Sequence, residues 1–266
     1  LFIFARKNYF ITIFLFTIVF VGIVSVFKLF SSYSQPTYVY AKVKMGQGLW
    51  WSGGAKPSIW FVDAIKKGDV ETDLLGKPLA QVQKVTYYPW WGTDQFDVYL
   101  TVKLKVSVNK KTKKYNFKRS TLGVGAPIEL EFSSAQLSGT IIELSEKEID
   151  ELYVEKQITL TKKWAYPWEY AAIQVGDKYF NGENTIFEII GKNAQNTSTI
   201  SNDPYGNSNP NITELKQYIT VRAKIKVKAV GDQLIFGEDQ IIRPGKTFNF
   251  STPSFTFTEY AVGEIK

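Results

Sequence analysis

The chain contains an internal repeat, and a repeat constrains the possible folds more than any single motif does. The segment 60–139 recurs within 168–263. The two copies begin alike. Trp60, Ala64, Ile65 and Gly68-Asp69 match Trp168, Ala172, Ile173 and Gly176-Asp177, each at a spacing of 108 residues. Further matches join residues 99–103 to 218–222, 124–125 to 244–245 and 139–141 to 263–265. The repeat predicts two modules of the same fold in tandem.

An apolar run precedes the repeat. In residues 9–30 the only charged side chain is Lys28. A bilayer core needs about 20 apolar residues in helical form, so the run predicts a transmembrane helix. A cleaved signal peptide is the alternative, although the apolar region of such a peptide is only about 7–15 residues long. Arg6 and Lys7 favour a cytoplasmic N-terminus. We therefore expect a single-pass protein of the plasma (inner) membrane, with its larger part outside the cytoplasm.

The remaining residues suffice for two domains of ordinary size, and the repeat favours two. The predicted organisation is a cytoplasmic N-terminus at 1–8, a transmembrane helix at 9–30, a linker at 31–37, a first β module at 38–144, a linker helix at 145–157 and a second β module at 158–266. The linker helix is predicted because Ser145 and Glu148 fit a capping box. The chain begins without Met and its second copy stops just after its closing strand, so truncation at either end is an open alternative.

Both copies carry strand signals. Residues 38–44 alternate between polar and apolar side chains, and residues 96–108 are a long run rich in Val, Leu, Tyr and Thr. We expect a mainly β fold with two small modules of the β-barrel or β-sandwich type. The second copy replaces the aromatic loop at 87–92 by residues 193–213, which are almost entirely polar. We expect this insertion to be a mobile surface loop.

The composition excludes several kinds of chemistry. The chain contains neither Cys nor His, which rules out a Ser-His-Asp triad, a Cys nucleophile and an ordinary zinc site. Paired carboxylates near Asp63 and Asp69 would still permit glycoside hydrolysis. However, the Gly-Asp pair recurs in both copies, and Asp favours turns by bonding its own backbone. We expect a protein that is not an enzyme and that holds no cofactor or metal.

Basic residues lie on one face of a predicted strand. Arg222, Lys224, Lys226 and Lys228 alternate with apolar residues, and the whole chain has a formal charge of +7. One interpretation is a platform for an anionic polymer or lipid head groups, where each cation contributes about 1 kcal/mol. The interpretation that we favour is a solvated strand face, on which lysine also prevents unwanted strand pairing. Nucleic acid is not an expected partner outside the cytoplasm.

The tryptophans form the second group of candidate residues. Trp60 and Trp168 hold matching positions, and we assign them to the two module cores. Two adjacent pairs flank glycines in loops, Trp50-Trp51 and Trp90-Trp91. Neighbours on a strand point to opposite faces, so we expect one member of each pair to be exposed. Stacking on sugar rings or a partner is one interpretation. Contact between the two loops is the one that we favour, because large aromatic side chains mostly serve burial.

The order of these parts resembles a bacterial family of single-pass membrane proteins of unknown function with duplicated β modules. The similarity lies in a stretch that ends in Gly-Asp (64–69), a long strand, the sequence Val-Gly-Ala-Pro-Ile (124–128) and a closing Gly-Thr-Ile (139–141). It covers most of both modules and implies no catalytic residues. A looser resemblance is to the β-barrel domains of lipid-transfer proteins of the mammalian-cell-entry type, which implies lipid transport by analogy alone. The tandem and the aromatic loops depart from that pattern.

Together these features predict a membrane-anchored protein of the cell envelope whose two extracytoplasmic β modules have a non-catalytic binding or scaffold role. The alternative is a glycan-binding module or an accessory module for lipid transport. The expected partners are the membrane, an anionic envelope polymer or glycan, and other proteins. The candidate binding residues are Trp50, Trp51, Trp90, Trp91, Arg222, Lys224, Lys226 and Lys228.

Overall fold

The computed structural model describes the chain except for residues 1–8, 32–36, 47–55, 91–93, 110 and 203–207. It divides into two compact units, residues 1–37 and 38–266. Helix α2 (Tyr9–Ser31) covers the apolar run, although several of its side chains lie outside the described set. Counting only described residues, no helix is both long enough and apolar enough to cross a membrane. The transmembrane role of residues 9–30 stays a prediction.

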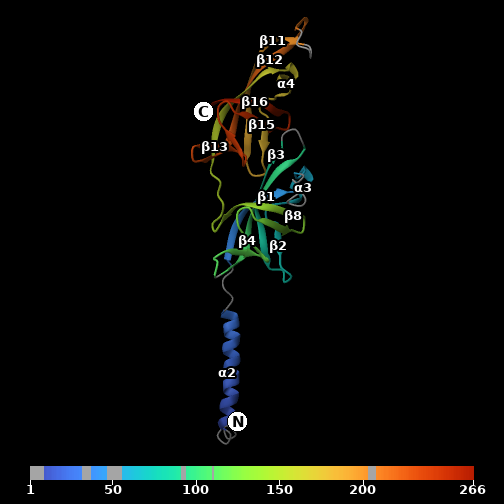
Figure 1. Cartoon of the computed structure of the whole chain (residues 1–266). Helices are drawn as coiled ribbons and strands as arrows, with labels where there is room; N and C mark the ends of the chain where they lie inside the picture. Colours follow the sequence, from blue (N-terminus) through green and yellow to red (C-terminus); the bar gives the residue numbers. More distant parts are fainter. Residues whose placement is uncertain (1–8, 32–36, 47–55, 91–93, 110, 203–207) are drawn as a thin grey trace. The chain divides into compact units, whose positions relative to one another are not determined.

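Residues 38–266 form two antiparallel eight-stranded sheets, each of which curls into a half-barrel (Figure 1). Module 1 contains β1 (Thr37–Gly46), α3 (Ile59–Ala64), β2 (Val70–Thr72), β3 (Pro78–Pro89), β4 (Phe96–Val108), β5 (Tyr115–Phe117), β6 (Ser120–Thr121), β7 (Pro127–Glu131) and β8 (Gln136–Ser145). Module 2 contains β9 (Tyr153–Ala165), α4 (Pro167–Ala172), β10 (Lys178–Phe180), β11 (Thr185–Asn202), β12 (Ser208–Val230), β13 (Gln233–Phe236), β14 (Gln240–Ile242), β15 (Thr247–Ser251) and β16 (Thr256–Ile265).

The two modules have the same topology. The main path of the first sheet runs β2-β3-β4-β1-β8-β7, and that of the second runs β10-β11-β12-β9-β16-β15. Each sheet also has a short hairpin attached to its central long strand, β5–β6 on β4 and β13–β14 on β12. Because every strand of one module has a counterpart in the other, the structure confirms the duplication that the sequence predicted and the mainly β fold.

The recurring Gly-Asp pair makes the same turn in both modules. Gly68 and Gly176 have φ angles of +95° and +91°, a conformation that favours glycine. The following aspartates each accept a hydrogen bond from a serine in the turn between the last two strands of the module, Ser134 to Asp69 at 3.1 Å and Ser254 to Asp177. This contact ties the two ends of each sheet together, so the pair is a structural element as expected.

The structure corrects the register of two predicted matches. The hydrogen bonds from Gly125 to Ile141 and from Gly245 to Val262 are equivalent. Gly139 therefore corresponds to Tyr260, and not to Gly263, which the sequence comparison matched to it. Likewise, the pair Val82–Val102 of module 1 is equivalent to the pair Ile189–Ala223 of module 2. Val102 therefore corresponds to Ala223, two residues beyond the residue that the sequence comparison matched to it. Glu259, with a φ of +63°, marks one extra residue in β16, and the short match at residues 263–265 does not detect such a bulge.

The linker helix predicted at 145–157 is wrong. Ser145 ends β8, residues 146–152 contain neither helix nor strand, and Tyr153 begins β9. The hydroxyl of Ser145 accepts a hydrogen bond from the backbone N–H of Lys147, only two residues ahead, instead of capping a helix. An extended path lets Ile149 bury its side chain and brings Glu151 to the lysines described below.

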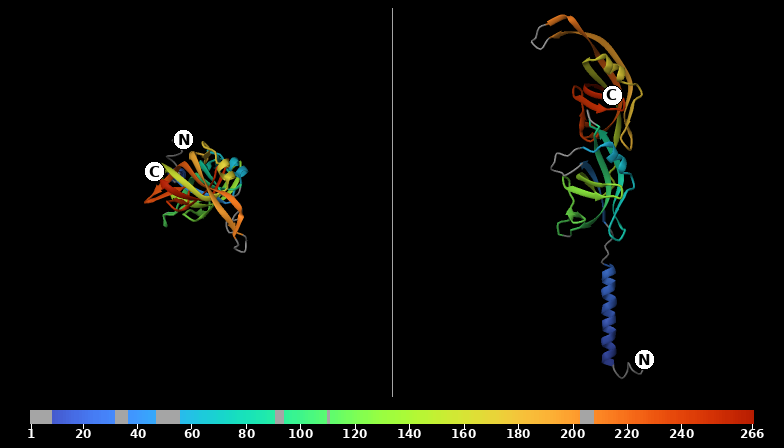
Figure 2. Two further views of the ribbon diagram at one scale, coloured as in Figure 1. Left: turned by 90° about the horizontal axis from the view of Figure 1, so that it is seen from above. Right: turned by 90° about the vertical axis from the view of Figure 1, so that its right-hand side faces the viewer.

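The mobile loop predicted at 193–213 is also wrong for the residues that the structure describes. These residues extend β11 and β12 into a long hairpin, with pairs from Asn193–Thr220 out to Asn202–Ser208. Figure 2 shows the hairpin continuing beyond the curled sheet. The pairing is made by backbone N–H and C=O groups, which a polar segment supplies as well as an apolar one, and this explains why strands form here.

Each module has its own core. In module 1 the apolar face of β1, formed by Val39, Ala41 and Val43, is fully buried. In module 2 a cluster of phenylalanines fills the half-barrel, with ring centroids 5.0 Å apart for Phe236 and Phe250. The tryptophans assigned to these cores are not there, because Trp60 and Trp168 are 62% and 63% exposed. A helix of six residues buries only one side, and in α3 Phe61 and Val62 occupy it.

The modules are joined at the far end of β3. Strand β2 and the turn before it bond β3 only as far as Val82, so within the described residues the rest of β3 has an open edge on that side. There the N–H of Tyr87 donates to the carbonyl of Asn181 at 3.0 Å, and the amide of Asn181 donates to the Tyr88 hydroxyl at 3.2 Å. Tyr88 and Tyr99 of module 1 belong to the core cluster of module 2. These contacts cover the open strand edge and fix the position of one module against the other.

Gly182 tests this joint. It has a φ of +99°, and a Cβ atom at this position would lie 2.5 Å from the carbonyl oxygen of Val85. We expect Gly182→Ala to lower the free energy of unfolding by roughly 1–3 kcal/mol more than a matched control, because overpacking costs about that much. The control is Gly176→Ala, which has a φ of +91° and open space around the new Cβ. Equal losses in denaturant unfolding would contradict the close approach of the modules.

Candidate functional site

A buried ion-pair network lies where the modules meet. Lys42 on β1 is 3% exposed and contacts Glu151, as well as Glu238 at 2.7 Å. Lys228 on β12 contacts the same two carboxylates at 2.6 and 2.7 Å. The two lysines and two glutamates balance in charge, and the Tyr153 hydroxyl donates a further hydrogen bond to Glu151. Buried charges are tolerated only when they are paired and hydrogen-bonded in this way.

The network shifts the pKa values of its members. Burial raises the pKa of Glu151, but Lys42 and then Lys228 and Tyr153 outweigh it, so the pKa falls to about 2. Burial lowers the pKa of Lys42, and the two glutamates more than reverse this, so the net shift is upward. Burial, followed by the charge of Glu238, raises the pKa of the nearby Tyr88 to about 12. Both members of the Lys42–Glu151 pair are therefore held in their charged forms.

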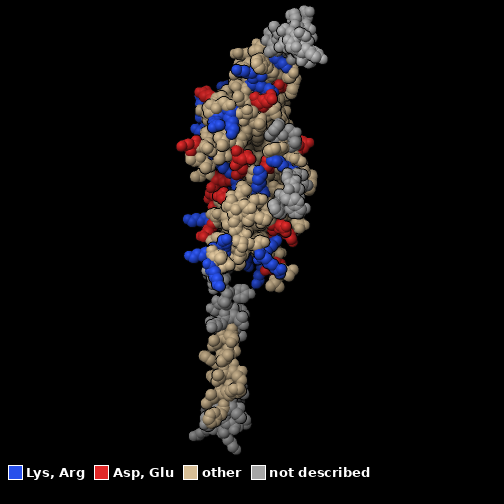
Figure 3. All heavy atoms as spheres, in the orientation of Figure 1, with Lys and Arg blue, Asp and Glu red and all other residues tan. Residues whose placement is uncertain are grey.

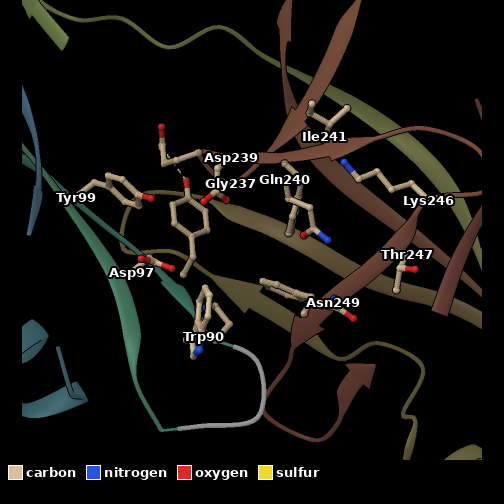
Figure 4. A pocket seen from close by; sticks show the side chains of 15 residues that line it. Trp90, Asp97, Tyr99, Gly237, Asp239, Gln240, Ile241, Lys246, Thr247 and Asn249 are labelled. Carbon is tan, nitrogen blue, oxygen red and sulfur yellow. Dashed lines mark hydrogen bonds between the residues drawn. The ribbon is translucent and has the colours of Figure 1, made fainter. Parts of the chain in front are cut away.

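A cleft of about 330 Å³ opens beside the network, between the two modules. Figure 4 shows Trp90, Asp97 and Tyr99 on one side and Gln240, Thr247 and Asn249 on the other. The first three come from the β3–β4 hairpin of module 1. The others come from β14 and β15 of module 2, so neither module makes the cleft alone. Its volume is at the lower end of the range for small-molecule sites, which is about 300–1,000 Å³.

The cleft combines aromatic faces with polar groups. The indole of Trp90 is 38% exposed, and the ammonium of Lys56 lies 3.3 Å from its ring centroid. Lys56 also bonds both oxygens of Asp97, at 2.7 and 2.8 Å, and Lys44 contacts the same carboxylate at 3.2 Å. Two of the three carboxylates lining the cleft, Asp97 and Glu238, are therefore each paired with two lysines. The third, Asp239, is exposed.

The structure places one of the four candidate loop tryptophans at this site. Trp90 lines the cleft. The other three, Trp50, Trp51 and Trp91, lie outside the described residues, and so does the predicted contact between the two tryptophan loops. The cleft residues contributed by module 2 were missed. They lie about 150 positions along the chain from Trp90, and no motif links residues so far apart.

The four basic residues lie on one face of β12 and alternate with buried side chains, as the pattern predicted. Their surroundings differ. Lys228 is in the buried network, Lys226 bonds Asn184 at 3.2 Å, Lys224 pairs with Glu155 at 3.5 Å, and Arg222 is exposed. Figure 3 shows acidic and basic side chains interspersed over the face in view. A role in binding an anionic polymer stays a prediction.

Within the described part of the chain, no group of three or more acidic side chains is arranged to hold a metal ion. The site thus consists of aromatic faces, amides, hydroxyls and carboxylates neutralised by lysine. Such a set is able to bind polar organic molecules through hydrogen bonds and ring stacking.

No protein-family model matches the chain, and comparisons with curated proteins and with solved structures also give no match. The resemblance to a bacterial family of single-pass membrane proteins therefore has no support beyond the duplicated β modules. The resemblance to lipid-transfer domains likewise has no support.

The ion-pair network predicts a pH dependence of stability. The folded-state pKa of Glu151 is about 2, below its ordinary value of 4.5. Its contribution to the free energy of unfolding is then complete above pH 4.5 and is lost as the pH falls towards 2. We expect Glu151→Gln to be less stable than the wild type near pH 6 and to lose less stability between pH 4.5 and 2. Over this pH range the wild type should lose on the order of 3 kcal/mol more of its free energy of unfolding than Glu151→Gln does.

Glu155→Gln is the control for this measurement, because Glu155 is 60% exposed and pairs with Lys224 at the surface. Surface pairs contribute about 0–1 kcal/mol. Urea unfolding at several pH values measures both variants. Parallel pH profiles for the wild type and Glu151→Gln would show that the network does not hold Glu151 in its charged form.

Proposed function

We propose that this protein is a non-catalytic binding protein that holds a carbohydrate in the cleft between its two modules. The observation that carries the proposal is the lining of the cleft, in which the partly exposed ring of Trp90 lies opposite Gln240, Thr247 and Asn249. Tyr99 contributes to the wall of the cleft but is itself buried. A sugar presents apolar ring faces and hydroxyl groups at its edge. Aromatic side chains match the faces, while amides and hydroxyls match the edge.

The charges of the cleft favour a neutral ligand over an ionic one. Asp97 and Glu238 are neutralised by lysines, and the lining contains one further carboxylate, Asp239, and one further lysine, Lys246. The same pairing favours binding over catalysis. A glycosidase needs a pair of carboxyl groups that act on the scissile bond, whereas Asp97 and Glu238 are each engaged in ion pairs with two lysines.

We also propose that α2 anchors the protein in the membrane of the cell envelope, with both modules outside the cytoplasm. The support is that described apolar side chains of α2 are exposed. Phe10, Phe16 and Phe20, for example, are each more than half exposed. The full chain should float with phosphatidylcholine vesicles in a density gradient, and a chain that lacks residues 1–31 should not. Sedimentation of both proteins away from the vesicles would contradict the anchor.

Calorimetric titration of the full chain in mild detergent tests the carbohydrate proposal. The probes are three neutral oligosaccharides: maltohexaose, cellohexaose and chitohexaose. We expect one of them to bind. Trp90→Ala on module 1 and Gln240→Ala on module 2 should each weaken that binding, Trp90→Ala by about tenfold, as expected for an aromatic hot spot.

Trp164→Ala is the matched control, because Trp164 is 62% exposed and lies on β9 outside the cleft. Circular dichroism of each variant shows whether the fold is intact. Binding that is equally strong in Trp90→Ala and Trp164→Ala, or no binding of any probe, would overturn the assignment of the cleft.

A further inference from the structure

A second hollow is lined, among the described residues, by module 1 alone. It lies between α3 and the turn that connects β7 to β8, and its volume is about 330 Å³. The residues lining it are Trp60, Phe61, Ala64, Ser134, Ala135, Gln136, Ser138 and Gly46, and none of them is charged. We call this hollow the α3 groove.

Trp60 presents a large aromatic surface at the α3 groove. Its side chain is 62% exposed, and the edge of its ring packs against Phe61 with 6.1 Å between the centroids. Phe61 is itself buried in the module core. The core thus holds one side of the indole while the rest stays in water. Trp60 lies at the position that Trp168 occupies in module 2, and Trp168 is exposed to the same degree.

The duplicated module shows what is unusual about the α3 groove. By strand register and turn hydrogen bonds, Ala135 and Gly139 of module 1 correspond to Phe255 and Tyr260 of module 2. Phe255 and Tyr260 are buried and pack edge to face with 6.1 Å between their centroids. The ring of Phe255 therefore occupies the place that Ala135 leaves open in module 1. The place of the Tyr260 ring is closed in module 1, where Val43 and the backbone of Lys44 lie against Gly139. The shared scaffold accommodates a ring at position 135, and module 1 carries only alanine there.

We propose that the α3 groove binds one neutral sugar residue. The indole of Trp60 stacks on the face of the sugar ring, while the amide of Gln136 and the hydroxyls of Ser134 and Ser138, which also line the groove, bond the sugar hydroxyls. Ser134 donates its own proton to Asp69 and so acts as an acceptor. None of the described residues that line the groove is charged, which disfavours phosphate groups and carboxylates as ligands. The choice of carbohydrate rests on the proposed function, and the groove then provides a second contact for the same class of ligand.

The most specific variant is Ala135→Phe, which places in module 1 the residue that module 2 carries at this position. It should block the α3 groove while leaving Trp60 in place. Trp60→Ala removes the stacking face and Trp60→Phe keeps a ring. Leu74→Ala is the control, because it removes a fully exposed apolar side chain from another turn of module 1.

The readout is the stoichiometry of a disaccharide of the type that binds in the cleft, measured by calorimetry on the full chain in mild detergent. The wild type and Leu74→Ala should bind two molecules per chain. Ala135→Phe and Trp60→Ala should bind one, and Trp60→Phe should retain the second site with a loss of less than tenfold. Trp90→Ala should also bind one, and the double variant Trp90→Ala/Ala135→Phe should bind none.

The outcomes separate the two proposals. Binding that is sensitive only to Trp90→Ala would overturn the α3 groove and leave the cleft intact. Binding that is sensitive only to Ala135→Phe and Trp60→Ala would overturn the cleft and support the groove. Sedimentation velocity gives a further check: if the wild type dimerises and Trp60→Ala is monomeric, the groove is a contact between two copies of the chain and the sugar site is overturned.

Discussion

Lys42 holds a positive charge at a place where only 3% of its side chain reaches water, and such a charge needs partners. Its partners come from elsewhere in the chain: Glu151 lies in the connection between the modules and Glu238 lies in module 2. Loss of a partner from a buried pair costs roughly 3–5 kcal/mol. An arrangement of the modules that kept Lys42 buried but moved Glu238 away would carry this cost. The network therefore disfavours such arrangements, and the cleft depends on the one that is observed.

Around this network the remaining contacts of the joint are backbone bonds and close packing. Asn181 bonds the open edge of β3, and Gly182 lets the two backbones approach without a clash. The joint therefore converts two half-barrels with separate cores into a single body. A cleft lined by both halves is a direct consequence, whereas the α3 groove belongs to module 1 alone. The two proposed sites thus differ in what they require of the joint.

The local pattern of the sequence predicted the β fold well and the joint not at all. Val39, Ala41 and Val43 alternate as a strand should, and they fill the core of module 1. The same alternation places Lys42 on the opposite face, where a pattern predicts solvent. That face is covered by residues more than 100 positions away, and contacts of this range leave no local signal. Trp60 was wrongly assigned to the core, because the spacing of residues in a six-residue helix is too short a pattern to show which side is buried.

The absence of cysteine from the chain makes the central claim, a fixed joint, directly measurable. Cysteines placed at the exposed Val124 of module 1 and Val230 of module 2 accept nitroxide labels at these two sites only. Pulsed electron paramagnetic resonance then gives the distribution of distances between the labels. We predict a single narrow distribution that broadens when Lys42→Met removes the charge at the centre of the network. A broad distribution in the protein that retains Lys42 would show that the modules move independently, and would contradict the joint and the cleft together.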